Sequence, residues 1–317
     1  LVLRETGDHG QALEAFRRAL ELGLEDGRLW FESGLALEAL GKEEEALDAF
    51  RRSAALEPAN RDAWFHRGLA LRRSGDLPGA LEAFDHVLSL EGEDRESLFH
   101  RGAILRRLGR REEGLGSLER SLGIEPGDAE AWFEKGLALG QLGKEEEALA
   151  SFQRSLELEP SHPGALFETG KLLSRAGSHA EAIEYFRRLA RLDPTNGEAW
   201  YWMGMSLSLV GSGEEALEAF DKALKRDPGN GDAWYNRGCI QNALGRLEEA
   251  VVSFDRALEM DPGDAESWFE RGQALHDLGR YEESVDSFDK TLALQGEMAE
   301  AWYQMGLAKE AIPDHAG

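Results

Sequence analysis

Apolar positions recur along this chain with the spacing of amphipathic helices. In residues 129–162, Trp132 and Gly136 are four positions apart, as are Ala148 and Phe152. Side chains with this spacing lie on one face of a helix. The segment therefore predicts two helices, joined by a short turn, whose apolar faces pack together. Gly136 and Ala148 leave room for a close approach, and Trp132 and Phe152 fill the space beside them.

The same pattern returns about every 34 residues. A period of this length predicts a solenoid, in which each repeat contacts only its neighbours. Residues 1–26 read as the tail of an earlier repeat, with Gly7, Ala12 and Phe16 in register, and residues 299–317 as the first helix of a further repeat and a tail. With Trp132 assigned to the fourth place, the eight complete repeats are residues 27–60, 61–94, 95–128, 129–162, 163–196, 197–230, 231–264 and 265–298.

Glycine and proline mark the predicted helix ends. Pro160 closes one repeat, and glycine recurs at the fifteenth place, where it tolerates the left-handed conformation that ends a helix. These glycines are Gly41, Gly75, Gly109, Gly143, Gly177, Gly211, Gly245 and Gly279.

The set Trp132, Gly136, Ala148, Phe152 and Pro160, at this spacing and repeated along essentially the whole chain, resembles the tetratricopeptide repeat (TPR) family. The resemblance implies an all-α fold, an α-α solenoid in which antiparallel helix pairs stack into a right-handed superhelix. It also implies that the first helices line a concave groove, which in this family usually binds peptides or extended protein segments.

Some repeats depart from the pattern. Leu98 and Leu166 replace the tryptophan, and Ser284 replaces the small alanine. Repeat 95–128 is the most irregular, and because glycine costs about 1 kcal/mol against alanine inside a helix, its second helix is predicted to be the weakest. We interpret these changes as tolerated drift, with a hinge as the alternative. The glycines in that helix are Gly114, Gly116 and Gly123.

A charge pattern connects the seventh and twenty-fifth places. Where the seventh place holds arginine, the twenty-fifth holds an acid, whereas Ser33 and Thr169 accompany Arg51 and Arg187. Lys135 with Gln153 does not fit this pattern, and Met203 with Asp221 is uninformative. We therefore expect salt bridges within repeats, with coincidence on two solvated faces as the alternative. The predicted pairs are Arg67 with Asp85, Arg101 with Glu119, Arg237 with Asp255 and Arg271 with Asp289.

The fifth place of the first helix is always aromatic. Helical geometry turns this place away from the core positions and toward the expected groove. These rings either pack against the adjacent first helix or present a ladder of partly exposed edges to a ligand. They are Phe31, Phe65, Phe99, Phe133, Phe167, Tyr201, Tyr235, Phe269 and Tyr303.

The other groove positions divide into a basic and an apolar part. The basic part suits carboxylate groups of a peptide, through bidentate arginine contacts, although it also fits a solvated charged face. The basic part comprises Arg72, Arg73, Arg106 and Arg107, flanked by His66 and His100 and extended by Lys171 and Arg175. The apolar part, a candidate anchor pocket, comprises Tyr201, Trp202, Met205, Leu209, Tyr235 and Cys239. Packing of Trp202 against a neighbouring molecule or the tail is the alternative.

Composition excludes several functions. The formal net charge of −25 argues against sequence-independent nucleic-acid binding, which needs a basic face. Cys239 is the single cysteine, so no disulfide framework or thiolate metal cluster is expected. No signal-peptide core or run of about 18 apolar residues occurs, so we expect a cytoplasmic protein without membrane contact. Because the chain starts at Leu1, inside a repeat, we interpret it as a piece of a longer protein.

Catalytic motifs are absent from the sequence. It has no phosphate-binding loop, zinc-protease helix, nucleophile elbow or calcium loop. His66 and His100 lack a third ligand, so neither a metal nor a cofactor is expected. The family's carboxylate clamp of Lys and Asn at the fifth and ninth places is also absent. We therefore expect a non-catalytic scaffold or adaptor that binds a protein or peptide segment. The alternatives are the substrate-recruiting arm of a larger enzyme, such as a glycosyltransferase, and a module that self-associates end to end.

Overall fold

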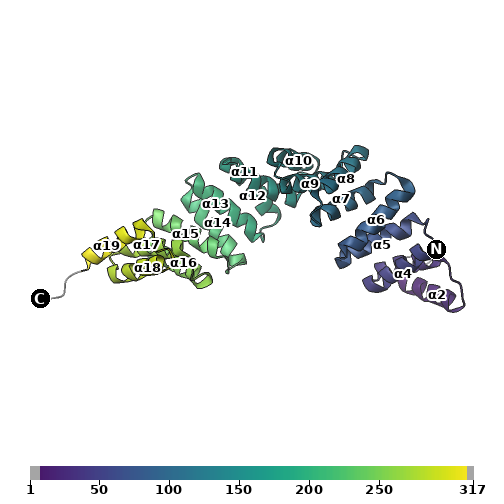
Figure 1. Cartoon of the computed structure of the whole chain (residues 1–317), viewed down its shortest axis with the longest axis horizontal. Coiled ribbons are helices and arrows are strands. Elements are labelled where there is room, and N and C mark those ends of the chain that lie inside the picture. Colours follow the sequence, from purple (N-terminus) through teal and green to yellow (C-terminus); the bar gives the residue numbers. More distant parts are fainter. Residues whose placement is uncertain (1–7, 313–317) are drawn as a thin grey trace. The chain divides into compact units, whose positions relative to one another are not determined.

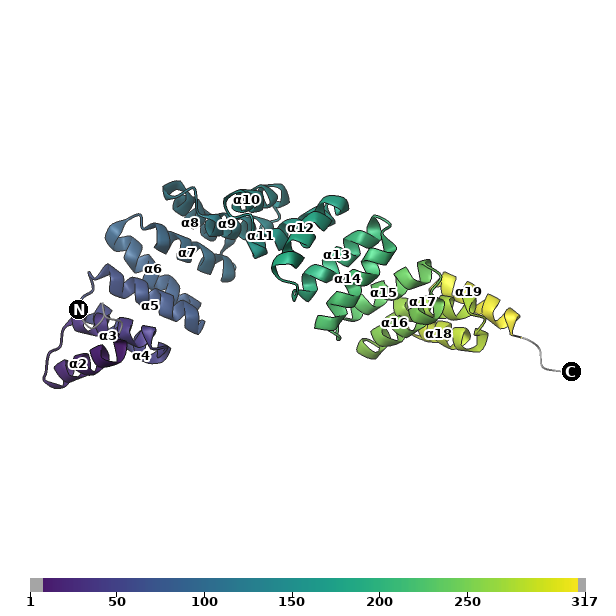
Figure 2. The same cartoon turned by 180° about the vertical axis from the view of Figure 1, so that it is seen from behind.

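The chain is a series of antiparallel helix pairs, seen in a computed structural model that describes residues 8–312 (Figure 1). Every regular element in this range is an α-helix. The helices pack into two compact units, which we call the N-terminal block (residues 1–160) and the C-terminal block (residues 161–317). In both blocks, helices that follow one another in the sequence pack side by side (Figure 2). The expected all-α solenoid of helix pairs is confirmed.

The N-terminal block begins with α2, which lies where the second helix of the earlier repeat is expected. Odd-numbered helices after it are first helices of repeats, and even-numbered helices are second helices. The block contains α2 (His9–Glu21), α3 (Gly27–Ala39), α4 (Glu43–Leu56), α5 (Arg61–Ser74), α6 (Leu77–Glu91), α7 (Arg95–Arg107), α8 (Arg111–Ile124), α9 (Ala129–Gln141) and α10 (Glu145–Leu158). Gly7, which was assigned to the same repeat, lies outside the described residues.

The C-terminal block continues the alternation of first and second helices. It contains α11 (Pro163–Arg175), α12 (His179–Leu192), α13 (Gly197–Leu209), α14 (Gly213–Arg226), α15 (Gly231–Ala243), α16 (Leu247–Met260), α17 (Ala265–Asp277), α18 (Tyr281–Leu294) and α19 (Ala299–Ala311).

A glycine and a phenylalanine bring the two helices of a pair together. Phe152 of α10 is 2% exposed, and a Cβ at Gly136 would lie 2.4 Å from a carbon of its ring. Any larger residue at Gly136 would therefore displace the ring. The same contact recurs, with Phe50, Phe84, Phe186, Phe220, Phe254 and Phe288 fully buried at the equivalent place.

Two further recurring places of the repeat, a glycine and a tryptophan, determine the structure of the turns. The glycine at the fifteenth place has positive φ, as at Gly75 with 87°, so the predicted left-handed stops are confirmed. The tryptophan at the fourth place donates its indole N–H to a carbonyl of the preceding inter-repeat turn. Trp132 Nε1 lies 2.9 Å from the Pro126 carbonyl, and Trp200 Nε1 lies 3.1 Å from that of Pro194. The tryptophan thus anchors each first helix to the turn that precedes it.

Repeat 95–128 is irregular for a packing reason. A Cβ at Gly114 would lie 2.9 Å from the Gly102 carbonyl oxygen and 3.0 Å from the Arg106 nitrogen. Backbone of α7 thus occupies the space that a side chain at Gly114 would need. Gly116 has nothing within 4 Å of the same position. Gly114 therefore allows α7 and α8 to approach closely, whereas Gly116 is drift on an open surface.

Three of the four predicted arginines form salt bridges, but with different partners. The fourth, Arg67, does not pair with Asp85 among the described residues and lies over the Trp64 ring instead. Arg101 Nε lies 2.6 Å from Asp85 Oδ1, and not against Glu119 of its own repeat. Glu119 instead pairs with Lys135 at 3.2 Å. The assignment within repeats was wrong because the seventh place of one repeat faces the twenty-fifth place of the preceding repeat. In the C-terminal block the corresponding distances are 2.7 Å for Arg237 and Asp221 and 2.6 Å for Arg271 and Asp255.

The arginines of these pairs also bind a serine of their own repeat. Arg101 Nη1 donates to Ser117 Oγ at 2.5 Å, and Arg237 and Arg271 do the same to Ser253 and Ser287. We call this arrangement the clasp: a basic residue at the seventh place, an acid at the twenty-fifth place of the preceding repeat, and a serine at the twenty-third place. Each clasp ties three helices across a junction between repeats.

Candidate functional site

The predicted basic residues lie on two neighbouring first helices of the N-terminal block. Arg72 and Arg73 end α5, and Arg106 and Arg107 end α7. Burial, followed by repulsion from Arg107 and Arg73, lowers the pKa of Arg72. The structure therefore brings Arg72, Arg73 and Arg107 close enough to interact electrostatically.

Carboxylates neutralise two of these four arginines. Arg106 forms a two-pronged hydrogen bond with Glu134, at 2.8 and 3.3 Å, and both side chains are largely buried. Arg73 is paired with Glu38 of α3. Among the residues that the structure describes, no carboxylate is within ion-pair distance of Arg107. Arg72 and Arg107 therefore carry the positive charge that is open to a ligand.

His100 packs against Arg72, one of these four arginines. Arg72 Nη1 lies 3.3 Å from His100 Nδ1, and burial, followed by the charge of Arg72, lowers the pKa of His100 to about 4. The imidazole is therefore neutral at physiological pH and accepts a hydrogen bond from the guanidinium. His66 Nδ1 lies 3.3 Å from Glu38 Oε2. Both predicted flanking histidines thus lie close to charged side chains of the neighbouring first helix.

The aromatic residues at the fifth place differ in exposure: Phe65 is buried, Tyr303 is exposed, and the other seven are half-buried. Phe65 is 8% exposed, and its ring centroid lies 5.7 Å from that of Phe84 on the second helix. A partly exposed edge was therefore the wrong prediction for Phe65. Phe99 is half-buried, with its centroid 5.1 Å from His100. Most equivalent rings in the described residues also contact the phenylalanine of the second helix, because that side chain reaches past the small glycine of the pair.

Lys171 and Arg175 belong to α11 of the C-terminal block. Lys171 Nζ lies 3.4 Å from Glu168 and 4.9 Å above the ring of Phe167. Arg175 is exposed in the last turn of the helix. The charge of Lys171 is thus partly compensated on its own helix.

The predicted apolar residues of α13 form a stripe along this helix. Trp202, Met205 and Leu209 are spaced at i, i+3 and i+7, so they share one face. Trp202 and Met205 are half-buried, and Leu209 is 61% exposed. Tyr201 contacts Trp202 edge to face, with ring centroids 6.1 Å apart. We call Trp202, Met205 and Leu209 the apolar stripe.

The two tyrosines of the predicted apolar part have acidic surroundings. Tyr201 and Tyr235 line a pocket of about 420 Å³ together with Asp232, Asp264 and Glu266. Burial raises the pKa of Tyr235, and burial followed by Asp232 raises that of Tyr201. The tyrosines are thus neutral beside carboxylates.

Cys239 lies next to Tyr235 and is half-buried. Burial, followed by the charge of Glu270, raises the pKa of the Cys239 thiol to about 11. Burial and Glu266 also raise the pKa of Glu270. The thiol is therefore protonated at neutral pH, which argues against a role as a nucleophile.

Sequence reasoning missed the carboxylates that compensate the arginines. Glu134 is 28 residues after Arg106, at the sixth place of the next repeat. Glu38, at the twelfth place, and His66, at the sixth place, have the same relation. Comparing the twelfth place of each repeat with the sixth place of the next would have revealed this pattern.

Comparison with known proteins assigns the class of protein. A sequence model described as tetratricopeptide repeat matches residues 1–60, 44–97, 99–163, 134–197, 203–265 and 243–299. The chain belongs to the tetratricopeptide repeat family. No curated protein sequence matches it.

Solved structures of the same family share the fold. YrrB, described as a TPR protein with an unusual peptide-binding site, is 23% identical, with a TM-score of 0.55 over 59% of this chain and 96% of its own. MamA from Desulfovibrio magneticus RS-1 is 25% identical, with a TM-score of 0.50 over 54% of this chain and 96% of its own. A tetratricopeptide repeat protein from Parabacteroides merdae is 21% identical, with a TM-score of 0.55 over 78% and 98%.

These findings define the general function. Repeats of this family form protein-interaction scaffolds, which bind protein or peptide partners and are generally not catalytic. In residues 8–312, none of the helices is long and apolar enough to cross a lipid bilayer.

Proposed function

We propose that the first-helix faces of this chain bind an extended or helical protein segment. In the N-terminal block, Arg72 and Arg107 receive acidic groups of the ligand, and in the C-terminal block the apolar stripe receives an apolar side chain. The positive charge at Arg72 is the observation that supports the binding of acidic groups. Burial, and then the neighbouring Arg107 and Arg73, lower the pKa of the Arg72 guanidinium, so its charged form gains stability when an anion arrives. The protein as a whole is strongly acidic, so this local positive site selects for acidic segments.

The basic site can be tested with peptides selected from a random-sequence display library. We expect the wild-type protein to enrich acidic peptides and the double variant Arg72→Glu, Arg107→Glu to lose that enrichment. Arg111→Glu with Arg154→Glu, on the second helices α8 and α10, is the matched control because it changes the net charge equally. An unchanged peptide set in the Arg72→Glu, Arg107→Glu protein would contradict the assignment.

The apolar stripe is tested with the same library. Leu209→Glu places a charge at the most exposed position of the stripe without disturbing the packed core. We expect it to remove selected peptides that carry a large apolar residue. Val210→Glu, at the exposed neighbouring position, is the control. If both variants select the same peptides as the wild type, the stripe is not a binding surface.

A second candidate function is self-association through α19. Trp302 and Tyr303 of this helix are 55% and 61% exposed, and large exposed aromatic side chains favour contact with another surface. We expect light scattering to show a mass that rises with concentration, and Trp302→Gln with Tyr303→Gln to reduce it. A strict monomer at high concentration would exclude this function.

A further inference from the structure

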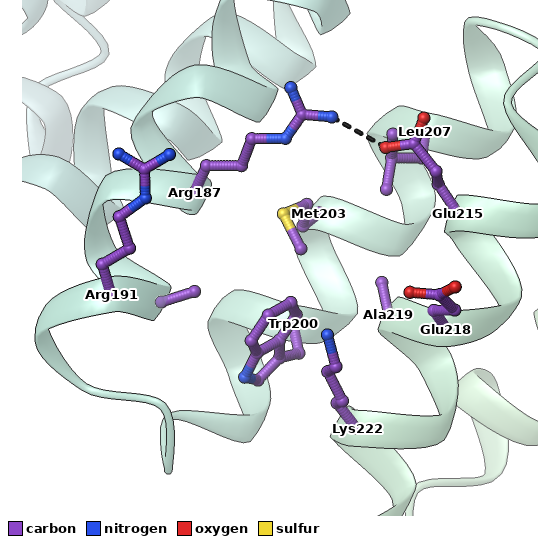
Figure 3. A pocket seen from close by; sticks show the side chains of 10 residues that line it. Arg187, Arg191, Trp200, Met203, Leu207, Glu215, Glu218, Ala219 and Lys222 are labelled. Carbon is purple, nitrogen blue, oxygen red and sulfur yellow. Dashed lines mark hydrogen bonds and ion pairs between the residues drawn. The ribbon is translucent and has the colours of Figure 1, made fainter.

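A pocket of about 250 Å³ opens between the second helices α12 and α14 (Figure 3). Its floor is apolar: Met203 and Leu207 of α13 and Ala219 of α14 are all buried. Trp200 forms one wall, fixed by its hydrogen bond to the Pro194 carbonyl. An apolar cavity of about 150 Å³ can hold a benzene ring. The pocket is therefore large enough for one large side chain.

The pocket lies at a junction that lacks the clasp. Met203 occupies the seventh place, Ala219 the twenty-third, and Arg187 the twenty-fifth place of the preceding repeat. Met203 carries no charge to meet Arg187, and Ala219 offers no hydroxyl. Arg187 turns instead to Glu215, at 2.7 Å, and to Glu184, at 3.0 Å. The side chains at the clasp places therefore do not bind one another across this junction, in contrast to those at the clasped junctions.

Two further pockets follow the same rule. A pocket lined by Arg17, Trp30 and Ser33 lies where the seventh place is serine. Another, lined by Arg51 and Arg67, lies where both clasp positions are basic. Neither junction has the clasp. Its absence therefore accompanies an opening between second helices at two junctions of the described chain. At the third junction the opening lies between α4, α5 and the N-cap residue of α6.

Basic side chains gather around the pocket at α12 and α14. Figure 3 shows Arg191 and Lys222 on either side of Trp200. Lys222 Nζ lies 4.1 Å above the Trp200 ring, and both cations are exposed. Within the described part of the chain, neither has a carboxylate at ion-pair distance. The last two turns of these two helices also contain Arg187, Arg188, Lys225 and Arg226.

Acidic side chains lie on one wall only. Glu215 is paired with Arg187, and Glu218 lies on α14 beside Lys222. A negatively charged ligand therefore meets attraction on the α12 side, at Arg191, and at Lys222 next to the indole. Six basic residues on two adjacent helix ends contrast with the net charge of −25 for the whole chain.

We propose that this surface docks an acidic segment of a partner protein, which inserts one apolar side chain between α12 and α14 and places carboxylates beside Arg191 and Lys222. Charge complementarity selects the partner chemistry, and the buried floor supplies the anchor. This surface involves the second helices, so it is separate from the first-helix faces proposed above.

A synthetic peptide, Gly-Glu-Glu-Leu-Glu-Glu-Gly, is the probe, with binding measured by isothermal titration calorimetry. The decisive variant combines Arg187→Asp, Met203→Arg and Ala219→Ser, which installs the clasp residues found at the next junction. This variant should remain folded, because the same three residues pack together there. We expect its affinity for the peptide to fall about tenfold, as when one aliphatic side chain loses its buried site.

Peptide and protein controls separate the anchor from the charge. Replacing Leu by Gly in the peptide should weaken binding to the wild type about tenfold and have little effect on binding to the clasp variant. Arg191→Glu with Lys222→Glu should abolish binding of either peptide. Because Arg72 and Arg107 are also open to acidic groups, the measurements are repeated in the Arg72→Glu, Arg107→Glu background, where the same differences should remain.

The reverse exchange provides a matched gain of function. Asp221→Arg, Arg237→Met and Ser253→Ala transfer the pocket residues to the following junction, and we expect a second binding site for the leucine peptide. Equal affinity of the wild type and the clasp variant would overturn the proposal. Sedimentation that shows self-association of the wild type and none of the clasp variant would also overturn it, since the occupant would then be a second copy of this chain.

Discussion

At the scale of single residues, the protonation state of a side chain can depend on a residue one repeat away. His100 is the clearest case, because α5 places Arg72 against its ring. Its surroundings favour the neutral imidazole, so proton uptake favours the unfolded chain. The histidine therefore has a structural role that its repeat alone does not reveal.

His100 predicts a pH dependence of stability. Its folded pKa of about 4 lies below the ordinary 6.5, so the unfolded state binds the proton more tightly. Stability of the helices around α7 should therefore fall as pH decreases from about 6.5 toward 4, by up to about 3 kcal/mol. Hydrogen exchange of α7 measures this. His100→Gln keeps an acceptor for Arg72 and should lack the decrease; an identical profile in both proteins would contradict the prediction.

Gly114 and Gly116 predict opposite effects of the same substitution. Gly114→Ala should destabilise the α7–α8 pair by about 1–3 kcal/mol, because its methyl group meets backbone atoms of α7. Gly116→Ala should stabilise it by about 0.5–1 kcal/mol, since alanine is the better helix former and the space is open. Chemical denaturation compares the two, and stabilisation by both would mean that α7 and α8 can separate without cost.

At the scale of helices, much of the fold follows directly from the sequence. The recurrence of Gly75 and its equivalents predicts where first helices end, and the spacing of Trp132 and Phe152 predicts how pairs pack. The salt-bridge partners could not be predicted from the sequence. It shows that Arg101 and an acid vary together, but not which repeat supplies the acid. Only the packed structure shows that Asp85, and not Glu119, faces Arg101.

The clasp predicts a measurable difference between two arginines at the same place in the repeat. Arg271→Met should destabilise its junction by about 1–2 kcal/mol, because it removes charge-assisted bonds to Asp255 and Ser287. Arg67→Met should have little effect, since Arg67 lies over the Trp64 ring and faces the basic Arg51. Local hydrogen exchange reports both. Equal losses would show that the clasp adds no stability.

At the scale of the whole molecule, each helix within a block mainly contacts the helices next to it in the sequence. Stability is then approximately a sum over neighbouring repeats. The sequence predicts this property well, because a 34-residue period allows little else. The binding surfaces were harder to predict. Glu134 neutralises Arg106, and Met203 opens a pocket on the side of the second helices, away from the expected groove.

Local cooperativity gives a prediction for the core. Phe288→Ala should cost about 3–5 kcal/mol in α17–α19, where Phe288 packs with Leu292 and Met305. Protection of α3–α6 against hydrogen exchange should not change. Phe50→Ala, in the N-terminal block, is the mirror experiment and should affect α3–α5, because Phe50 also packs against His66 of α5. A uniform loss of protection along the chain in either variant would show that the molecule unfolds as one unit.

The tryptophan anchors have a spectroscopic consequence. Trp64, Trp132, Trp200, Trp234 and Trp268 each bind the carbonyl of the proline in the turn before them. An indole that exchanges this carbonyl for water changes its emission. Each of these repeats therefore carries its own fluorophore, positioned at the turn that joins it to the preceding repeat. In variants that keep one tryptophan and replace the others with phenylalanine, fluorescence would follow the fraying of a chosen repeat without any added label.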